Sequence, residues 1–250
     1  MSAQVIEAYW MPGCSSCLRM KEFIEKSGKS YTAINADEVP GALDKLKASG
    51  LLLPATCVGD DCVNGVDLAA VARLIGVEYS PPAMLSPAGL VERYNLNVSA
   101  GRRFIAQMTD AALEFQLPGR NREMMDVADQ VAMVARSFLD AYYDDRHNVA
   151  YYQKPDFVRS RQQLLDRLDE TLRLVNAWWE DDGQDDPLDR VTQTYWGYPT
   201  LHEVLEREVW HTTQHARQLM YALEQLGITP DGPLTQVNLA GLPLPAGIHD

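Results

Sequence analysis

The pattern of apolar residues changes once along the chain, near residue 80, and this change constrains the fold more than any other feature. Before it, short β-rich runs alternate with short helical runs; after it, the long apolar runs all have helical spacing. The segment between them, VEYSPPAMLSPAGL, has three prolines in 14 residues, which prevents a continuous helix. The sequence therefore predicts two domains, residues 1–77 and 90–250, joined by a proline-rich linker at 78–89.

The first domain has the predicted element order βαβαββα. A strand from Gln4 to Trp10 precedes the helical run SCLRMKEFIEKSG, and a second strand, SYTAINAD, precedes a helix that opens after Pro40. Two short strands, ATCVG and DCVNG, lead to a helix that Asp67 would cap. A strand–helix–strand unit of this length predicts a parallel pair, and the last two strands predict a hairpin at the edge of the same sheet.

The second domain reads as long amphipathic helices with short or medium connections. We expect these helices at Leu90–Gln116, Asn121–Tyr143, Asp156–Asp181 and Pro199–Leu226. Four such helices predict a four-helix bundle, followed by an irregular C-terminal tail. The fold class expected for the whole chain is α/β plus all-α.

Composition and charge exclude several classes of protein. A content of 46% hydrophobic and 23% charged residues is typical of a globular chain. The net charge of −13 argues against nucleic acid as a partner, because phosphates require a basic surface. The first residues lack a secretory pattern and no apolar run approaches the ~18 residues of a membrane span, so we expect a cytoplasmic protein with no membrane partner. Four cysteines are too few for a secreted disulfide scaffold.

Two of the cysteines, Cys14 and Cys17, lie three positions apart in YWMPGCSSC, between the first strand and the first helix. A helix that begins after Cys14 directs its unpaired N–H groups and the positive end of its dipole at that sulfur, which lowers the thiol pKa. Cys17 is one turn further on and close enough to attack a mixed disulfide on Cys14. Cys14 is therefore the predicted nucleophile and Cys17 the resolving thiol.

This Cys-x-x-Cys motif at the first strand-to-helix turn, within the order βαβαββα, resembles the glutaredoxin branch of the thioredoxin fold over about residues 3–77. The segment LLLPATCVGDDCVNGVDL is similar to the family's substrate-side segment, in which the proline is cis. The resemblance implies glutathione as substrate or cosubstrate, bound by Leu53, Pro54, Gly65, Val66 and Asp67. The chain departs from the family at Ser15-Ser16, where glutaredoxins usually have Pro-Tyr, so reduction potential and substrate choice need not follow the family.

Other interpretations of the cysteines compete with this one. The spacing of Cys14 and Cys17, with Cys57 and Cys62, could form a four-thiolate zinc site, although Cys57 and Cys62 fall on the expected edge hairpin. Cys57 and Cys62 are more simply interpreted as packed or partly exposed small hydrophobic residues. A third interpretation is a thioredoxin-fold adaptor without catalysis, since a fold does not fix a function.

The last predicted helix, LHEVLEREVWHTTQHARQLMYAL, carries polar residues in its apolar stripe. His211 and His215 are four positions apart, the spacing at which one helix face can bind a divalent metal, and Glu208 lies one turn before them as a third ligand or an imidazole orienter. The alternative is a pair of histidines that only make hydrogen bonds to their neighbours.

The stretch HTTQHARQL resembles the His-x-x-x-His-x-x-Gln-Leu signature of DinB-like metalloproteins over about residues 88–245. The resemblance implies a four-helix bundle, a divalent metal such as zinc or nickel held by three histidines, thiol-dependent transferase or isomerase activity, and by analogy a homodimer. Gln130 stands about where the second-helix histidine is expected. The remaining candidates for the third ligand are Glu208, Asp126, Asp129, Gln130 and His147, of which we favour Glu208; the alternative is a degenerate site that has lost its metal.

The two resemblances predict an enzyme of thiol chemistry. It would be a thiol–disulfide oxidoreductase or a glutathione-dependent transferase, with a small-molecule thiol or disulfide as partner and a bundle pocket that binds the thiol or its acceptor. The alternative is a redox-responsive sensor or binding module without turnover. Tyr195 and Trp196, in the long loop before the last helix, could line a pocket over His211.

Overall fold

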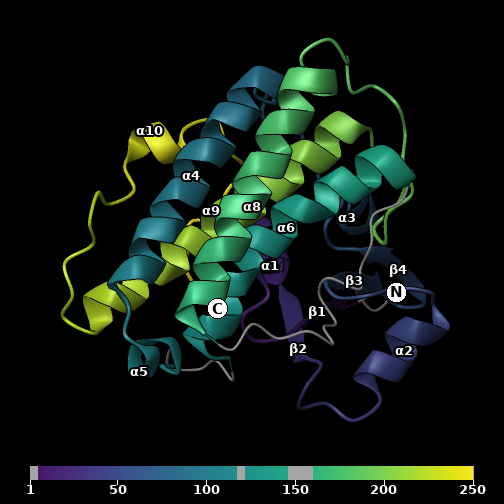
Figure 1. The fold of residues 1–250 in the computed structure, drawn as a ribbon. Coiled ribbons are helices and arrows are strands. Elements are labelled where there is room, and N and C mark those ends of the chain that lie inside the picture. The colour runs from purple at the N-terminus through teal and green to yellow at the C-terminus, as the bar shows by residue number, and fades with distance from the viewer. Residues whose placement is uncertain (1–4, 117–121, 146–159, 250) are drawn as a thin grey trace. The chain divides into compact units, whose positions relative to one another are not determined.

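The computed structural model divides the chain into two compact units (Figure 1). It describes residues 5–116, 122–145 and 160–249. Of these, the N-terminal unit comprises 5–82, 195–197 and 245–249, and the helical unit comprises the remainder. Among the described residues, no helix is long and apolar enough to cross a membrane.

The N-terminal unit has the predicted order βαβαββα. Its elements are β1 (Ile6–Trp10), α1 (Ser15–Lys26), β2 (Tyr31–Asn35), α2 (Ala42–Ala48), β3 (Ala55–Val58), β4 (Asp61–Asn64) and α3 (Leu68–Ile75). The strand order is β2-β1-β3-β4, with β1 and β2 parallel and the other pairs antiparallel. The expected parallel pair and edge hairpin are both confirmed.

Both faces of this sheet are covered, because alternate residues of each strand point to opposite faces. Ile6 and Ala8 of β1 pack with apolar residues of α1 and α3 on one face. Tyr9 of β1 and Cys57 of β3 pack with Leu46 of α2 on the other, which we call the α2 face. Strand β1, which leads into α1, is thus held between two small cores.

In the described residues, the helical unit contains four long α-helices and two short ones, besides a π-helical turn. They are α4 (Pro87–Gln107), α5 (Asp110–Leu113), α6 (Met124–Asp144), α8 (Arg161–Trp178), α9 (Leu201–Gln225) and α10 (Gln236–Leu239). The helix α9 packs against α4 and α6, and α8 packs against the same two helices, which closes a bundle of four. The mixed α/β plus helical fold class is confirmed at this level.

The first bundle helix differs from the prediction at both ends. It begins at Pro87 and not at Leu90, because the Ser86 hydroxyl accepts a hydrogen bond from the Gly89 amide and proline is well suited to the first helical position. It ends at Gln107, since Met108 has an extended backbone and Thr109 caps the separate helix α5. The single helix predicted to Gln116 is therefore wrong.

The other bundle helices also differ at their ends. The predicted starts Asn121 and Asp156 lie outside the described residues. Beyond its end at Trp178, α8 continues as a π-helical turn, Trp179–Gly183. The start of α9 is fixed by a reciprocal capping box, in which Thr200 and Glu203 each bond the other's backbone N–H.

Candidate functional site

Cys14 and Cys17 lie where the sequence predicts, at the turn from β1 into α1. Gly13 has a φ of 76°, and Cys14 is the N-cap of α1. The Cys14 sulfur accepts a hydrogen bond from the Cys17 backbone N–H at 3.1 Å and forms a disulfide with the Cys17 sulfur. Cys14 is half-buried, whereas Cys17 is fully buried. The predicted capping position of Cys14 is confirmed.

The residues around the pair restrict what can reach it. Ser15 and Ser16 are both buried, and the Ser15 hydroxyl has no hydrogen-bond partner among the described residues. The Lys21 ammonium of α1 lies 3.7 Å from the ring centroid of Trp10, the last residue of β1. A cation therefore lies over an aromatic ring four residues before Cys14, a feature that the sequence analysis did not identify.

The peptide bond between Leu53 and Pro54 is cis, as the resemblance implies. The Pro54 carbonyl accepts a hydrogen bond from the Gly65 N–H at 2.9 Å, which joins the two segments expected to bind glutathione. Val66 is buried and its N–H is bonded to Asn64, while Asp67 caps α3 by accepting from the Ala70 N–H at 2.9 Å. The structure thus places Leu53, Pro54, Gly65, Val66 and Asp67 in one bonded region.

Met20 connects α1 to this region. Its sulfur accepts a hydrogen bond from the Thr56 hydroxyl at 3.2 Å, and a Cβ built on Gly65 would overlap that sulfur. The same Cβ would also lie 3.1 Å from Pro54 Cβ. Gly65 is therefore required by close packing between the helix that carries the cysteines and the segment after the cis proline.

Cys57 and Cys62 form a disulfide, which the sequence analysis did not identify and which uses two of the thiolates that a four-cysteine zinc site would need. Their predicted packing is confirmed, because Cys57 is fully buried in the core of the α2 face and Cys62 packs against it. All four cysteines lie among the described residues, and each belongs to one of the two disulfides. Cys57 on β3 pairs directly with Cys62 on β4. A two-residue turn at Gly59-Asp60 sets this register, and that signal was present in the sequence.

Glu7, Tyr9 and Lys45 form a polar cluster on the α2 face. The Lys45 ammonium donates to the Glu7 carboxylate at 2.7 Å and to the Tyr9 hydroxyl at 2.8 Å. The hydrogen bond from Lys45 lowers the pKa of Glu7, and the bond to Glu7 raises the pKa of Lys45. Burial raises the pKa of Tyr9.

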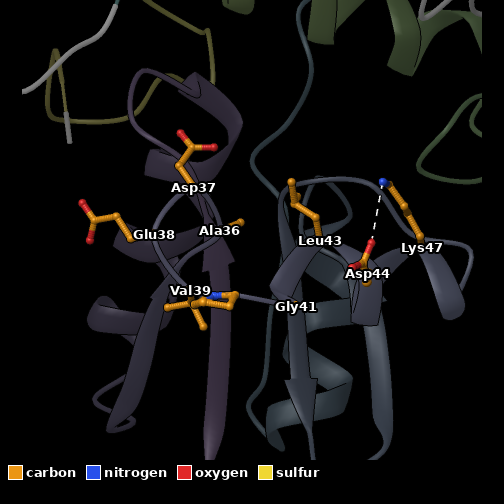
Figure 2. A pocket seen from close by; sticks show the side chains of 9 residues that line it. Ala36, Asp37, Glu38, Val39, Gly41, Leu43, Asp44 and Lys47 are labelled. Carbon is orange, nitrogen blue, oxygen red and sulfur yellow. Dashed lines mark ion pairs between the residues drawn. The ribbon is translucent and has the colours of Figure 1, made fainter.

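An acidic hollow of about 310 Å³ lies between the end of β2 and α2 (Figure 2). Asp37, Glu38 and Asp44 line it, and Asp44 pairs with Lys47 at 3.9 Å. None of the predicted site residues lines it, so we assign it no function.

In the helical unit, His211, His215 and Glu208 are all buried on α9. The two imidazole centroids are 4.7 Å apart, and His215 Nδ1 lies 3.0 Å from the Gln218 amide oxygen. Glu208, the favoured third ligand, instead accepts a hydrogen bond from the buried Arg207 guanidinium at 2.5 Å. Within the described part of the chain, no three His, Cys, Asp or Glu side chains are placed to hold a metal.

The other candidate ligands are also accounted for. Asp129 is buried and pairs with Arg167 at 2.8 Å, and Gln130 is buried beside it on α6. Asp126 is half-buried at the start of α6, and His147 lies outside the described residues. Glu208 and Asp129 are therefore both bonded to guanidinium groups in the described part of the chain.

Tyr195 and Trp196 belong to the N-terminal unit, whereas His211 belongs to the helical unit. The Tyr195 carbonyl lies 3.4 Å from the Asn64 side-chain amide, and the rings of Tyr195 and Trp196 meet edge to face. The sequence shows a long loop rich in aromatic residues before α9. It does not indicate whether these residues belong to the N-terminal unit or to the helical unit.

Comparison with known proteins leaves the family of the chain open. No protein-family model matches it, and no curated protein matches it significantly. The functional conclusion therefore rests on the geometry of the cysteine turn.

Proposed function

We propose that the N-terminal unit is a glutaredoxin-like thiol–disulfide oxidoreductase, with Cys14 as nucleophile and Cys17 as resolving thiol. The observation that carries this proposal is the difference between the two sulfurs. Cys14 caps α1 and accepts an amide hydrogen bond, which favours its thiolate, while Cys17 is fully buried. A substrate sulfur can therefore reach Cys14 and not Cys17.

The exchange proceeds in two displacements. The Cys14 thiolate attacks a sulfur of the substrate disulfide, and one substrate thiol leaves as the Cys14 mixed disulfide forms. The Cys17 thiolate then attacks Cys14 Sγ, which releases the second substrate thiol and forms the Cys14–Cys17 disulfide. Two molecules of a low-molecular-weight thiol restore the dithiol and leave as their own disulfide.

Glutathione is the proposed thiol. The cis Leu53-Pro54 bond and its link to Gly65 support this choice, because they hold the segment that contains the cis proline beside the segment that caps α3. For the helical unit, we propose a DinB-like bundle that serves thiol-dependent transfer, supported by its four-helix packing and the buried pair His211 and His215. A zinc or nickel ion on this pair stays a proposal, and no step is assigned to it.

Turnover of a glutathione mixed disulfide tests the proposal. The wild type and Cys17→Ser should both reduce the mixed disulfide of glutathione and 2-hydroxyethanethiol, because one thiol suffices for that exchange. Cys14→Ser should lose the activity. Brief alkylation of the reduced protein near neutral pH should modify Cys14 first, because the α1 N-terminus favours its thiolate while Cys17 is fully buried.

The outcomes separate enzyme from sensor. Oxidation of the cysteine pair in a single stoichiometric event, without repeated turnover, would favour the redox-responsive sensor. Equal loss of activity in both serine variants would indicate a strict dithiol mechanism, and faster alkylation of Cys17 would reverse the assignment of the nucleophile.

A further inference from the structure

The second disulfide, between Cys57 and Cys62, is asymmetric in its surroundings. Cys57 is fully buried on β3, an inner strand, and packs in the core of the α2 face. Cys62 is half-buried on β4, which is the edge strand of the sheet. Cys62 is therefore the more accessible of the two cysteines to a thiol in solution, whereas Cys57 is shielded.

The hairpin does not need this bond to keep its register. Ala55–Asn64, Thr56–Val63 and Val58–Asp61 pair across the same two strands, and Gly59 provides the positive φ for the turn. The bond closes a ring of six residues, and the stabilisation expected from restricting the unfolded chain decreases as the ring becomes shorter. A structural role alone is thus a weak explanation for the pair.

We propose that Cys57–Cys62 is a second thiol–disulfide exchange site, reduced by low-molecular-weight thiols and independent of the activity proposed for Cys14 and Cys17. A small thiolate attacks Cys62 Sγ, the Cys57–Cys62 bond breaks, and Cys57 takes a proton and becomes a buried thiol. A second small thiol attacks the mixed disulfide and frees Cys62, leaving with the first as a disulfide. The reduction of one protein disulfide thus consumes two small thiols and yields one small-molecule disulfide.

The local charge selects among small thiols. Asp60 and Asp61 are exposed directly before Cys62, and Glu7 pairs with Cys57 in the sheet register. Lys45 is the cation bonded to Glu7, so the acidic groups are in excess around the hairpin. A cationic thiol should therefore react faster than glutathione, which carries carboxylates, and salt should reduce the difference.

The full chain carrying Cys14→Ser and Cys17→Ser isolates this site. Treatment with cysteamine, without denaturant, should convert the Cys57–Cys62 disulfide into two protein thiols per chain. The circular dichroism spectrum should stay that of the folded protein. At low salt cysteamine should react severalfold faster than glutathione, and Asp60→Asn with Asp61→Asn should narrow that ratio. In this background a further Cys57→Ser variant should form a mixed disulfide with cystamine rapidly at Cys62, and a Cys62→Ser variant should not do so at Cys57.

Two results would overturn the proposal. One is a disulfide that resists cysteamine until denaturant unfolds the chain, which would make the bond structural. The other is equal labelling of Cys57 and Cys62 in the two single variants. Neither depends on whether Cys14 catalyses exchange, because that pair is removed in every variant used.

Discussion

Gly65 is the residue at which packing around the cysteine helix is least tolerant. Its missing side chain leaves room for Met20, and an added Cβ would also meet Pro54. Gly65→Ala should lower the free energy of unfolding by about 1–3 kcal/mol through overpacking, and it should also slow exchange at Cys14. Chemical unfolding and the mixed-disulfide assay measure the two effects.

A matched control is Gly89→Ala in the first turn of α4. A Cβ there would make only ordinary contacts, the nearest at 3.4 Å from the Ser86 hydroxyl. Gly89→Ala should not lower the free energy of unfolding and should raise it by up to about 1 kcal/mol, since alanine favours a helix over glycine. If Gly65→Ala were as stable as Gly89→Ala, the close contact with Met20 would not constrain the fold.

The sequence predicts single residues well where chemistry and local structure coincide. Asp67 as a cap and Cys14 as the first residue before a helix need only short-range patterns, and both are confirmed. The bond between Cys57 and Cys62 needs a strand register, and the partner of Glu208 is the adjacent Arg207, which helical spacing treats as lying on another face. Such pairings depend on packing and are not visible in the pattern alone.

At the scale of elements, α2 is tied to the sheet by an ion pair that titrates. Glu7 has a pKa below its ordinary value of 4.5, so its pair with Lys45 stabilises the fold above that value and the stabilisation is lost as the pH falls through the lower, folded-state pKa. Lys45→Met should therefore be less stable than wild type at about pH 7, and the difference should shrink at an acidic pH, as Glu7 takes up a proton in the folded wild type. Urea unfolding at the two pH values measures this.

Lys47→Met is the control for that experiment. Lys47 also lies on α2, but its pair with Asp44 is 3.9 Å long and both side chains are largely exposed, at 70% and 84%. An exposed ion pair of this kind contributes little to the free energy of unfolding. Lys47→Met should therefore differ from wild type in stability by almost the same small amount at both pH values. A constant deficit for Lys45→Met at both pH values would mean that Lys45 acts through packing on Tyr9 and not through charge.

Elements of the N-terminal unit were easier to predict than those of the bundle. Glycines at helix ends and a proline before β3 separate short elements whose order follows directly. In the bundle, Met108 and Thr109 interrupt an apolar pattern that continues unchanged, so α5 was missed. For the centre of α9 the sequence pattern predicts that one stripe of the helix is buried. Residues 207–216 are instead all buried, polar side chains included.

At the scale of the whole molecule, the end of the chain returns to the first helix. The N–H groups of Ala246 and Gly247 donate to the Glu22 carboxylate of α1 at 2.8 and 2.7 Å. Deleting residues 245–250 should destabilise the N-terminal unit by about 1–3 kcal/mol, because two charge-assisted hydrogen bonds are lost. Amide exchange in α1 should increase, and hydrogen-exchange mass spectrometry can locate it.

Glu22→Gln separates this contact from a general effect of truncation. The amide oxygen can still accept one of the two hydrogen bonds, so the loss should be smaller than for the deletion. The same deletion in a Glu22→Ala background should add little, since its partner is already absent. Additive losses would show that the tail stabilises the unit through other contacts.

The last prediction concerns the histidine pair of α9. It belongs to the scale of the whole molecule, because a bound metal would change the stability of the folded chain. His211 and His215 are buried with their rings 4.7 Å apart, and His215 Nδ1 lies 3.0 Å from the Gln218 amide oxygen, so the test decides between metal binding and hydrogen bonding alone. A metal that binds only the folded state would stabilise it by about 2.7 kcal/mol at a hundredfold excess over its dissociation constant. The melting temperature of the wild type should then fall when a chelator is added, and it should recover when zinc or nickel is supplied.

The His211→Ala, His215→Ala double variant should melt at the same temperature with and without chelator, because its ligands are gone. His202→Ala is the control: His202 is half-buried and bonded to the Leu85 carbonyl at 2.8 Å, and its variant should keep the wild-type response to chelator. A wild type that contains no metal as purified and melts identically in chelator and metal would assign the pair to hydrogen bonding. Gln130 would then mark where the third histidine implied by the DinB-like resemblance has been replaced.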